Sequence, residues 1–141
     1  MDFSIKQEEF DYELPSWNIE KQVRDHISKS FPLFKDDDII MVSDLDEIPL
    51  RSIIPTLYDL DEICTFLQYF LNFNLKFLTG HKCCATTFSK LKYIRPFSVE
   101  DLRRNRFHFS KINEAGYHLS YWETPEGIQK KINNFAHQEL N

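Results

Sequence analysis

A short apolar run, Ile39 to Val42, constrains this chain most, because it leads within two residues into a group of carboxylates. Consecutive apolar residues between polar ones are typical of a strand that is covered on both faces, as in a parallel sheet. Asp44, Asp46 and Glu47 follow it. Ligands of open α/β sheets bind beyond the carboxyl ends of the strands, so the sequence predicts an α/β fold with a ligand site at this point.

The carboxylates after this strand favour a metal ion. Three of them within four positions repel one another, and a bound cation relieves the repulsion. Oxygen ligands suit Mg²⁺ and Mn²⁺. The alternative is a solvated acidic turn, because acidic residues often follow strands and Pro49 marks a turn shortly afterwards.

Composition narrows the class of protein. At 141 residues, with 13 phenylalanines and only 3 glycines, the chain is expected to form one globular domain over residues 1–141. A net charge of −5 lacks the basic field that nucleic-acid binding needs, so no nucleic-acid partner is expected. The three cysteines have no CxxC spacing and predict neither a disulfide framework nor a zinc cluster.

Targeting segments are not visible in the sequence. The first residues lack a basic region followed by an apolar one, so no secretory signal is predicted. The most apolar window, residues 64–78, is shorter than the ~20 residues of a membrane span and contains polar side chains. The chain by itself is therefore expected to be cytoplasmic and without a membrane span.

Periodicity predicts the remaining elements. An apolar residue at every fourth position between 17 and 31 indicates a helix, which we expect to pack on the 39–42 strand. Alternation over residues 65–77 indicates a strand, followed by a turn at 79–81 and an antiparallel return over 83–88. A capping box at Ser98 starts a short helix, residues 117–121 alternate as a strand, and Thr124 and Pro125 start the last helix. The basic residues of segment 90–106 could attract a diphosphate, but a solvated face is the favoured interpretation: Lys90, Lys92, Arg95, Arg103, Arg104 and Arg106.

Three motifs in order along the chain resemble glycosyltransferase family 17, the family of the β-1,4-mannosyl-glycoprotein 4-β-N-acetylglucosaminyltransferase. They are Val-Ser-Asp-Leu-Asp-Glu-Ile-Pro over residues 42–49, Gly-Tyr-His-Leu-Ser-Tyr over residues 116–121, and the segment 128–139 with Lys131, Phe135, His137 and Glu139. The chain departs from the family at two places. It has Tyr117 where the family has Trp, and Glu123 and Thr124 where the family usually has two glycines.

The resemblance implies a fold and a reaction. The implied fold is a mixed, mainly parallel sheet with flanking helices, a partial Rossmann-like nucleotide-sugar fold of type A. The implied reaction is inverting transfer of a sugar, GlcNAc from UDP-GlcNAc, to a glycan or glycoprotein acceptor with Mn²⁺ or Mg²⁺. Only 43 residues precede Asp44, so the chain is expected to lack the N-terminal nucleotide-binding portion. Family members in animals are Golgi membrane proteins, which implies a Golgi location if an anchor lies upstream.

The resemblance also implies roles for individual residues. Asp46 is the direct metal ligand, and Asp44 binds the metal through water or binds the ribose of the donor. His118 completes the metal ligands, with His137 as the alternative, and Lys131 contacts a phosphate oxygen. Either Glu47 or Glu139 is the base that takes the acceptor proton.

Two other functions remain open. An apolar strand that ends in Asp-Leu-Asp also opens the haloacid-dehalogenase-like phosphohydrolases, where Asp44 would be the nucleophile. After Asp101, however, the chain has only isolated glutamates instead of the paired acids of that class. The non-enzymatic alternative is a catalytically incomplete remnant that binds glycan or nucleotide.

Overall fold

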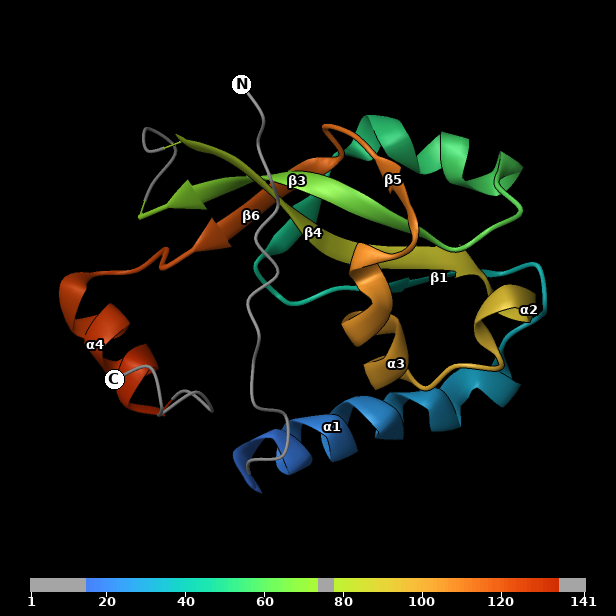
Figure 1. Cartoon of the computed structure of the whole chain (residues 1–141), viewed down its shortest axis with the longest axis horizontal. Helices are drawn as coiled ribbons and strands as arrows, with labels where there is room; N and C mark the ends of the chain where they lie inside the picture. Colours follow the sequence, from blue (N-terminus) through green and yellow to red (C-terminus); the bar gives the residue numbers. More distant parts are fainter. Residues whose placement is uncertain (1–14, 74–77, 135–141) are drawn as a thin grey trace.

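One curled sheet organises the structure, a computed structural model that describes residues 15–73 and 78–134 (Figure 1). The strands are β1 (Ile39–Val42), β2 (Glu47–Pro49), β3 (Cys64–Asn72), β4 (Leu78–Lys90), β5 (Ser110–Ile112) and β6 (Gly116–Ser120). The α-helices are α1 (Pro15–Ile27), α2 (Leu91–Ile94), α3 (Val99–Arg104) and α4 (Pro125–Asn134). Three 3₁₀ segments connect them: η1 (Ser28–Leu33), η2 (Arg51–Asp59) and η3 (Asn105–Phe107).

The sheet has the order β1-β4-β3-β6-β2, and β5 pairs with the first part of β3. β1 with β4, β3 with β4 and β2 with β6 are antiparallel, whereas β5 and β6 run parallel to β3. The expected mainly parallel, Rossmann-like sheet is therefore wrong, since the sheet is mixed, mostly antiparallel and curled into a half-barrel.

The misleading signal was the apolar run of β1. Ile40 and Val42 pack against one core cluster and Ile39 against another, so both faces of β1 are partly covered. A continuous apolar run reports cover on both faces and carries no information on strand direction. β1 lies at the edge of the sheet, antiparallel to β4.

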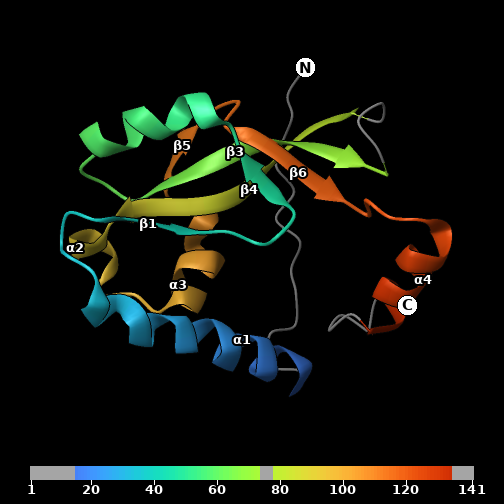
Figure 2. The ribbon, with the colours of Figure 1, turned by 180° about the vertical axis from the view of Figure 1, so that it is seen from behind.

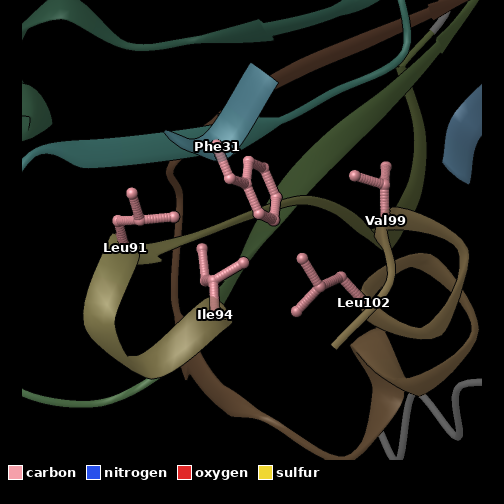
Figure 3. Packing of buried hydrophobic residues seen from close by; sticks show 5 residues of the cluster. All are labelled: Phe31, Leu91, Ile94, Val99 and Leu102. Carbon is pink, nitrogen blue, oxygen red and sulfur yellow. The ribbon is translucent and has the colours of Figure 1, made fainter. Parts of the chain in front are cut away.

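Two apolar clusters hold the sheet between its helices. In the first, Phe31 packs among α2 and α3 side chains, and Figure 3 shows its ring facing Leu91, Ile94, Val99 and Leu102. The second cluster, around Phe66 and Phe88, lies under η2 on the opposite face of the sheet (Figures 1 and 2). Each large apolar side chain buried in this way contributes about 1.5–3 kcal/mol relative to an exposed one.

The first helix has the predicted position but not the predicted orientation. Four apolar residues were expected to pack on β1. Ile19, Val23 and Ile27 are 67%, 64% and 52% exposed, whereas Phe31 in η1 is buried in the cluster against which Ile40 and Val42 of β1 pack. α1 packs instead on α3 through its polar side, where Arg24 pairs with the buried Glu100 at 3.1 Å. Apolar periodicity predicted that a helix forms here. The side of α1 that faces inward is the one whose Arg24 pairs with the buried Glu100 of α3.

Local signals predicted the helix starts well. Ser98 accepts from the backbone N–H of Asp101 at 3.0 Å in a complete capping box. Thr124 accepts from the N–H of Gly127 at 3.2 Å at the start of α4. The antiparallel return after β3 is confirmed. The turn predicted at residues 79–81 is wrong, because those residues lie within β4.

No helix in residues 15–73 and 78–134 is long and apolar enough to cross a membrane, which agrees with the absence of a predicted span.

Candidate functional site

The turn between β1 and β2 carries the acidic residues. The N–H of Glu47 donates to the carbonyl of Asp44 at 3.1 Å and closes the turn, leaving the Leu45 side chain fully exposed. β2 then pairs with β6 so that Glu47 lies opposite His118, and the N–H of Leu119 donates to the carbonyl of Asp46 at 2.8 Å. Backbone hydrogen bonds thus hold the acidic turn next to β6.

Asp46 is where the three motifs meet. Its carboxylate lies 3.5 Å from Nε2 of His118 on β6 and 3.6 Å from Nζ of Lys131 on α4. α4 lies beyond the end of β6, apart from α2 and α3 (Figures 1 and 2). Segments far apart in sequence therefore place a carboxylate, an imidazole and an ammonium group at one point.

The imidazole of His118 is held on several sides. Sγ of Cys83 on β4 lies 3.3 Å from Nδ1, and the Phe70 ring meets the imidazole edge-on with the ring centroids 5.0 Å apart. Burial of the ring disfavours its protonated form, but Asp46 and Cys83 outweigh burial and raise the pKa of His118 to about 10. The same contact with His118 lowers the pKa of Asp46.

Asp44 belongs to a second, more buried group. Arg103 of α3 is only 9% exposed, and its guanidinium pairs with Asp44 and, at 2.7 Å, with Glu47. It also donates to the carbonyl of Ala85 at 3.2 Å. Glu47, 3% exposed, accepts in addition from the N–H of Asp44 at 3.1 Å and from Thr86 at 3.4 Å. This group fixes the turn to α3 and β4.

The described residues offer a partial metal site. Within residues 15–73 and 78–134, no three His, Cys, Asp or Glu side chains are grouped to hold one ion. Asp46 supplies one oxygen donor, and Nε2 of His118 becomes a nitrogen donor when a metal ion displaces its proton. An ion that acts on a diphosphate commonly takes only one or two protein ligands, and substrate phosphates complete its coordination. The pair therefore fits a metal ion that arrives with a diphosphate.

A cavity of about 390 Å³ opens beside Asp46. Its walls come from the acidic turn, the end of β6 and the start of α4. The lining residues are Leu45, Asp46, Leu119, Tyr121, Trp122, Glu123, Gly127, Ile128 and Lys131.

The sequence-predicted site residues fall into three groups. Asp46, His118 and Lys131 come together. Asp44 and Glu47 are engaged by Arg103 instead, so their metal-binding and base roles stay predictions. His137 and Glu139 lie outside the described residues.

Sequence reasoning missed the residues that hold the turn. Arg103 was assigned to a solvated face, which is wrong because its guanidinium is buried against two carboxylates. Its position in the last turn of a six-residue helix carried no signal of burial. Thr86 and Cys83 lie in a β-prone run that shows nothing of which side chains face the acidic turn.

The raised pKa of His118 predicts a pH-dependent contribution to stability. The folded state holds the proton more tightly than the unfolded state, so the contribution is complete below pH 6.5 and is lost as the pH rises toward about 10. The difference in free energy of unfolding between the wild type and His118→Gln should therefore shrink from pH 6.5 to 9.5. Urea unfolding at several pH values measures it, and a difference that grows over this range would contradict the assignment.

Comparisons with protein-family models, with curated proteins and with solved structures find no match for this chain.

Proposed function

We propose that the chain is a glycosyltransferase of the family 17 type, which transfers a sugar from a nucleotide sugar, UDP-GlcNAc, to a glycan acceptor with Mn²⁺ or Mg²⁺. The observation that carries the proposal is the convergence at Asp46 of side chains from all three motifs that suggested the family. The proposal rests on this group and not on a type A fold.

Each residue of the group has a task in such a reaction. Asp46 and His118 would hold the divalent ion, which when bound supplies charge stabilisation for the departing diphosphate. Lys131, half-exposed and 3.6 Å from Asp46, places an ammonium group where a phosphate oxygen can accept its hydrogen bond. Cys83 and Phe70 fix the orientation of the imidazole. Arg103 holds the turn that presents Asp46.

Binding without transfer is the second candidate function. The observation that favours it is the burial of Glu47 against Arg103, which keeps this carboxylate away from an acceptor hydroxyl. Glu139 is then the remaining candidate base from the sequence. A protein that binds donor without a base would take up UDP-GlcNAc but transfer no sugar.

Donor binding can be tested by thermal unfolding. Mn²⁺ with UDP-GlcNAc at 100 times its Kd should stabilise the wild type by about 2.7 kcal/mol and raise Tm by several degrees. Asp46→Asn removes a partly buried carboxylate, so it should abolish this shift, and the Tm of the free variant gives the cost of losing the contacts with His118 and Lys131. Differential scanning fluorimetry measures both quantities.

The matched control is Asp37→Asn, which removes an exposed carboxylate from the same acidic stretch. It should leave the ligand-induced shift unchanged. A wild type that gains no stability from Mn²⁺ and UDP-GlcNAc would refute the proposed function. Stabilisation without sugar transfer would select the binding-only candidate. Mg²⁺-dependent phosphomonoester hydrolysis that Asp44→Asn abolishes would select the phosphohydrolase.

A further inference from the structure

The cavity beside Asp46 has two kinds of wall. Tyr121 and Trp122 provide an aromatic wall, and the Trp122 side chain is 43% exposed. Asp46, Glu123 and Lys131 provide the polar groups. A concave site that combines an aromatic surface with a few convergent polar groups is the usual form of a small-ligand site.

Backbone geometry directs consecutive side chains into this cavity. Tyr121 has φ of 52°, the left-handed region that non-glycine residues rarely adopt, and the N–H of Glu123 donates to the carbonyl of Tyr121 at 2.9 Å. This tight reversal after β6 places residues 121–123 together on the cavity wall. Strained backbone of this kind persists where the surrounding structure holds it, and it is common at ligand sites.

Gly127 makes room for the Glu123 side chain. A Cβ at position 127 would lie 1.9 Å from Cγ of Glu123, so the glutamate packs directly on the glycine. The N–H of Thr124 donates to the Glu123 carboxylate at 2.9 Å. The carboxylate is thereby held at the wall, in the place where the family pattern has glycine.

Charge and size indicate the ligand chemistry. The charged side chains of the lining are two carboxylates and one ammonium group, and the imidazole of His118 lies against one of the carboxylates, so the wall has no excess of positive charge to hold a free phosphate or an acidic sugar. Carboxylates accept hydrogen bonds from hydroxyl groups, and an aromatic face packs well on the C–H face of a sugar ring. A volume of about 390 Å³ lies near the lower end of the range for ligand pockets and suits a single ring better than a whole nucleotide sugar.

We propose that this cavity binds one neutral hexopyranose ring, with Trp122 against its C–H face and Glu123 and Asp46 accepting from its hydroxyls. This inference rests on the proposed function, because a sugar bound here lies next to the group that would hold the diphosphate. The ring belongs either to the donor or to the acceptor, and both share the same chemistry.

Free sugars without metal or nucleotide provide the test. Saturation-transfer NMR on the wild-type chain should show magnetisation transfer to millimolar N-acetylglucosamine. Trp122→Ala and Gly127→Ala should each weaken binding at least tenfold. Alanine favours a helix more than glycine does, so Gly127→Ala should keep α4 while displacing Glu123. Gly80→Ala is the matched control, because a Cβ there meets nothing within 4 Å, and it should bind as the wild type does.

A second measurement uses tryptophan emission. The chain has two tryptophans, so in a Trp17→Phe background only Trp122 reports. Saturable quenching by N-acetylglucosamine or by methyl mannoside supports the proposal. No transfer to free sugar in the wild type, an unchanged affinity in Trp122→Ala, or quenching by UDP but not by sugar would overturn it.

Competition distinguishes the two sources of the ring. Loss of free-sugar binding when Mn²⁺ and UDP-GlcNAc are present assigns the cavity to the donor ring, and retained binding assigns it to the acceptor. The NMR experiment with free sugar contains neither metal nor nucleotide. A negative result there would overturn the sugar site, whereas a negative result in the thermal-shift test would refute donor binding.

Discussion

Arg103→Met is expected to lower the free energy of unfolding by about 3–5 kcal/mol. The guanidinium is the cationic partner of both Asp44 and the 3%-exposed Glu47, and methionine of similar length would leave Glu47 buried without that compensation. The large effect comes from the stranded charge more than from the strength of the ion pair itself. Urea unfolding monitored by circular dichroism measures the change.

A matched control and a rescue sharpen this prediction. Arg95→Met removes an exposed guanidinium that pairs with Asp36 at 2.8 Å, and it should cost less than about 1 kcal/mol. Adding Glu47→Leu to Arg103→Met removes the stranded charge and should recover part of the loss. If Arg103→Met costs no more than Arg95→Met, Glu47 is not held as the structure places it.

The other large effect is expected from Gly116→Ala. Gly116 has φ of 152°, and an added Cβ would lie 2.2 Å from the backbone carbonyl oxygen of Ile48 and 2.9 Å from Nε2 of Gln68. A backbone atom of the paired strand cannot yield as a flexible side chain can, so β2 and β6 must separate locally. We expect a loss of about 3 kcal/mol or more, in the range of severe point mutations.

Separation of β2 and β6 should also change the group around Asp46. His118 lies two residues beyond Gly116 on β6, so separation of the strands should also reduce the stabilisation that we propose Mn²⁺ and UDP-GlcNAc to give. Gly80→Ala serves again as the control, since it strains a φ of 76° without a collision and should cost about 1–2 kcal/mol. Equal costs for the two variants would mean that β2 does not approach Gly116 so closely.

Local physics made much of the secondary structure predictable. The Ser98 capping box and the Thr124-Pro125 start of α4 are short-range hydrogen-bonding signals, and both were right. Strand direction and the orientation of α1 were not predictable in the same way. They depend on which distant element supplies a partner, such as Glu100 for Arg24, and periodicity along one segment does not contain that information.

The same limit applies to the site. Among the residues that the resemblance singled out, Asp46, His118 and Lys131 are brought together by the structure. The resemblance gave Asp44 and Asp46 different roles as ligands, but it did not predict that Arg103 of α3 would pair with Asp44. The cavity wall at Glu123 depends on the absence of a side chain at Gly127. The sequence shows a glycine at 127, but only the structure shows that this glycine contacts Glu123.

The pairing of β3 gives the backbone hydrogen bonds in different parts of this site different lifetimes. β3 is hydrogen-bonded to β4 on one side and to β5 and β6 on the other, whereas the three-residue β2 is a sheet edge. Amide hydrogens of β3 should exchange with deuterium only when the whole domain unfolds, while those of β2 exchange through local opening. The turn that carries Asp44 and Asp46 can therefore open locally together with β2, while β3 keeps its hydrogen bonds on both sides.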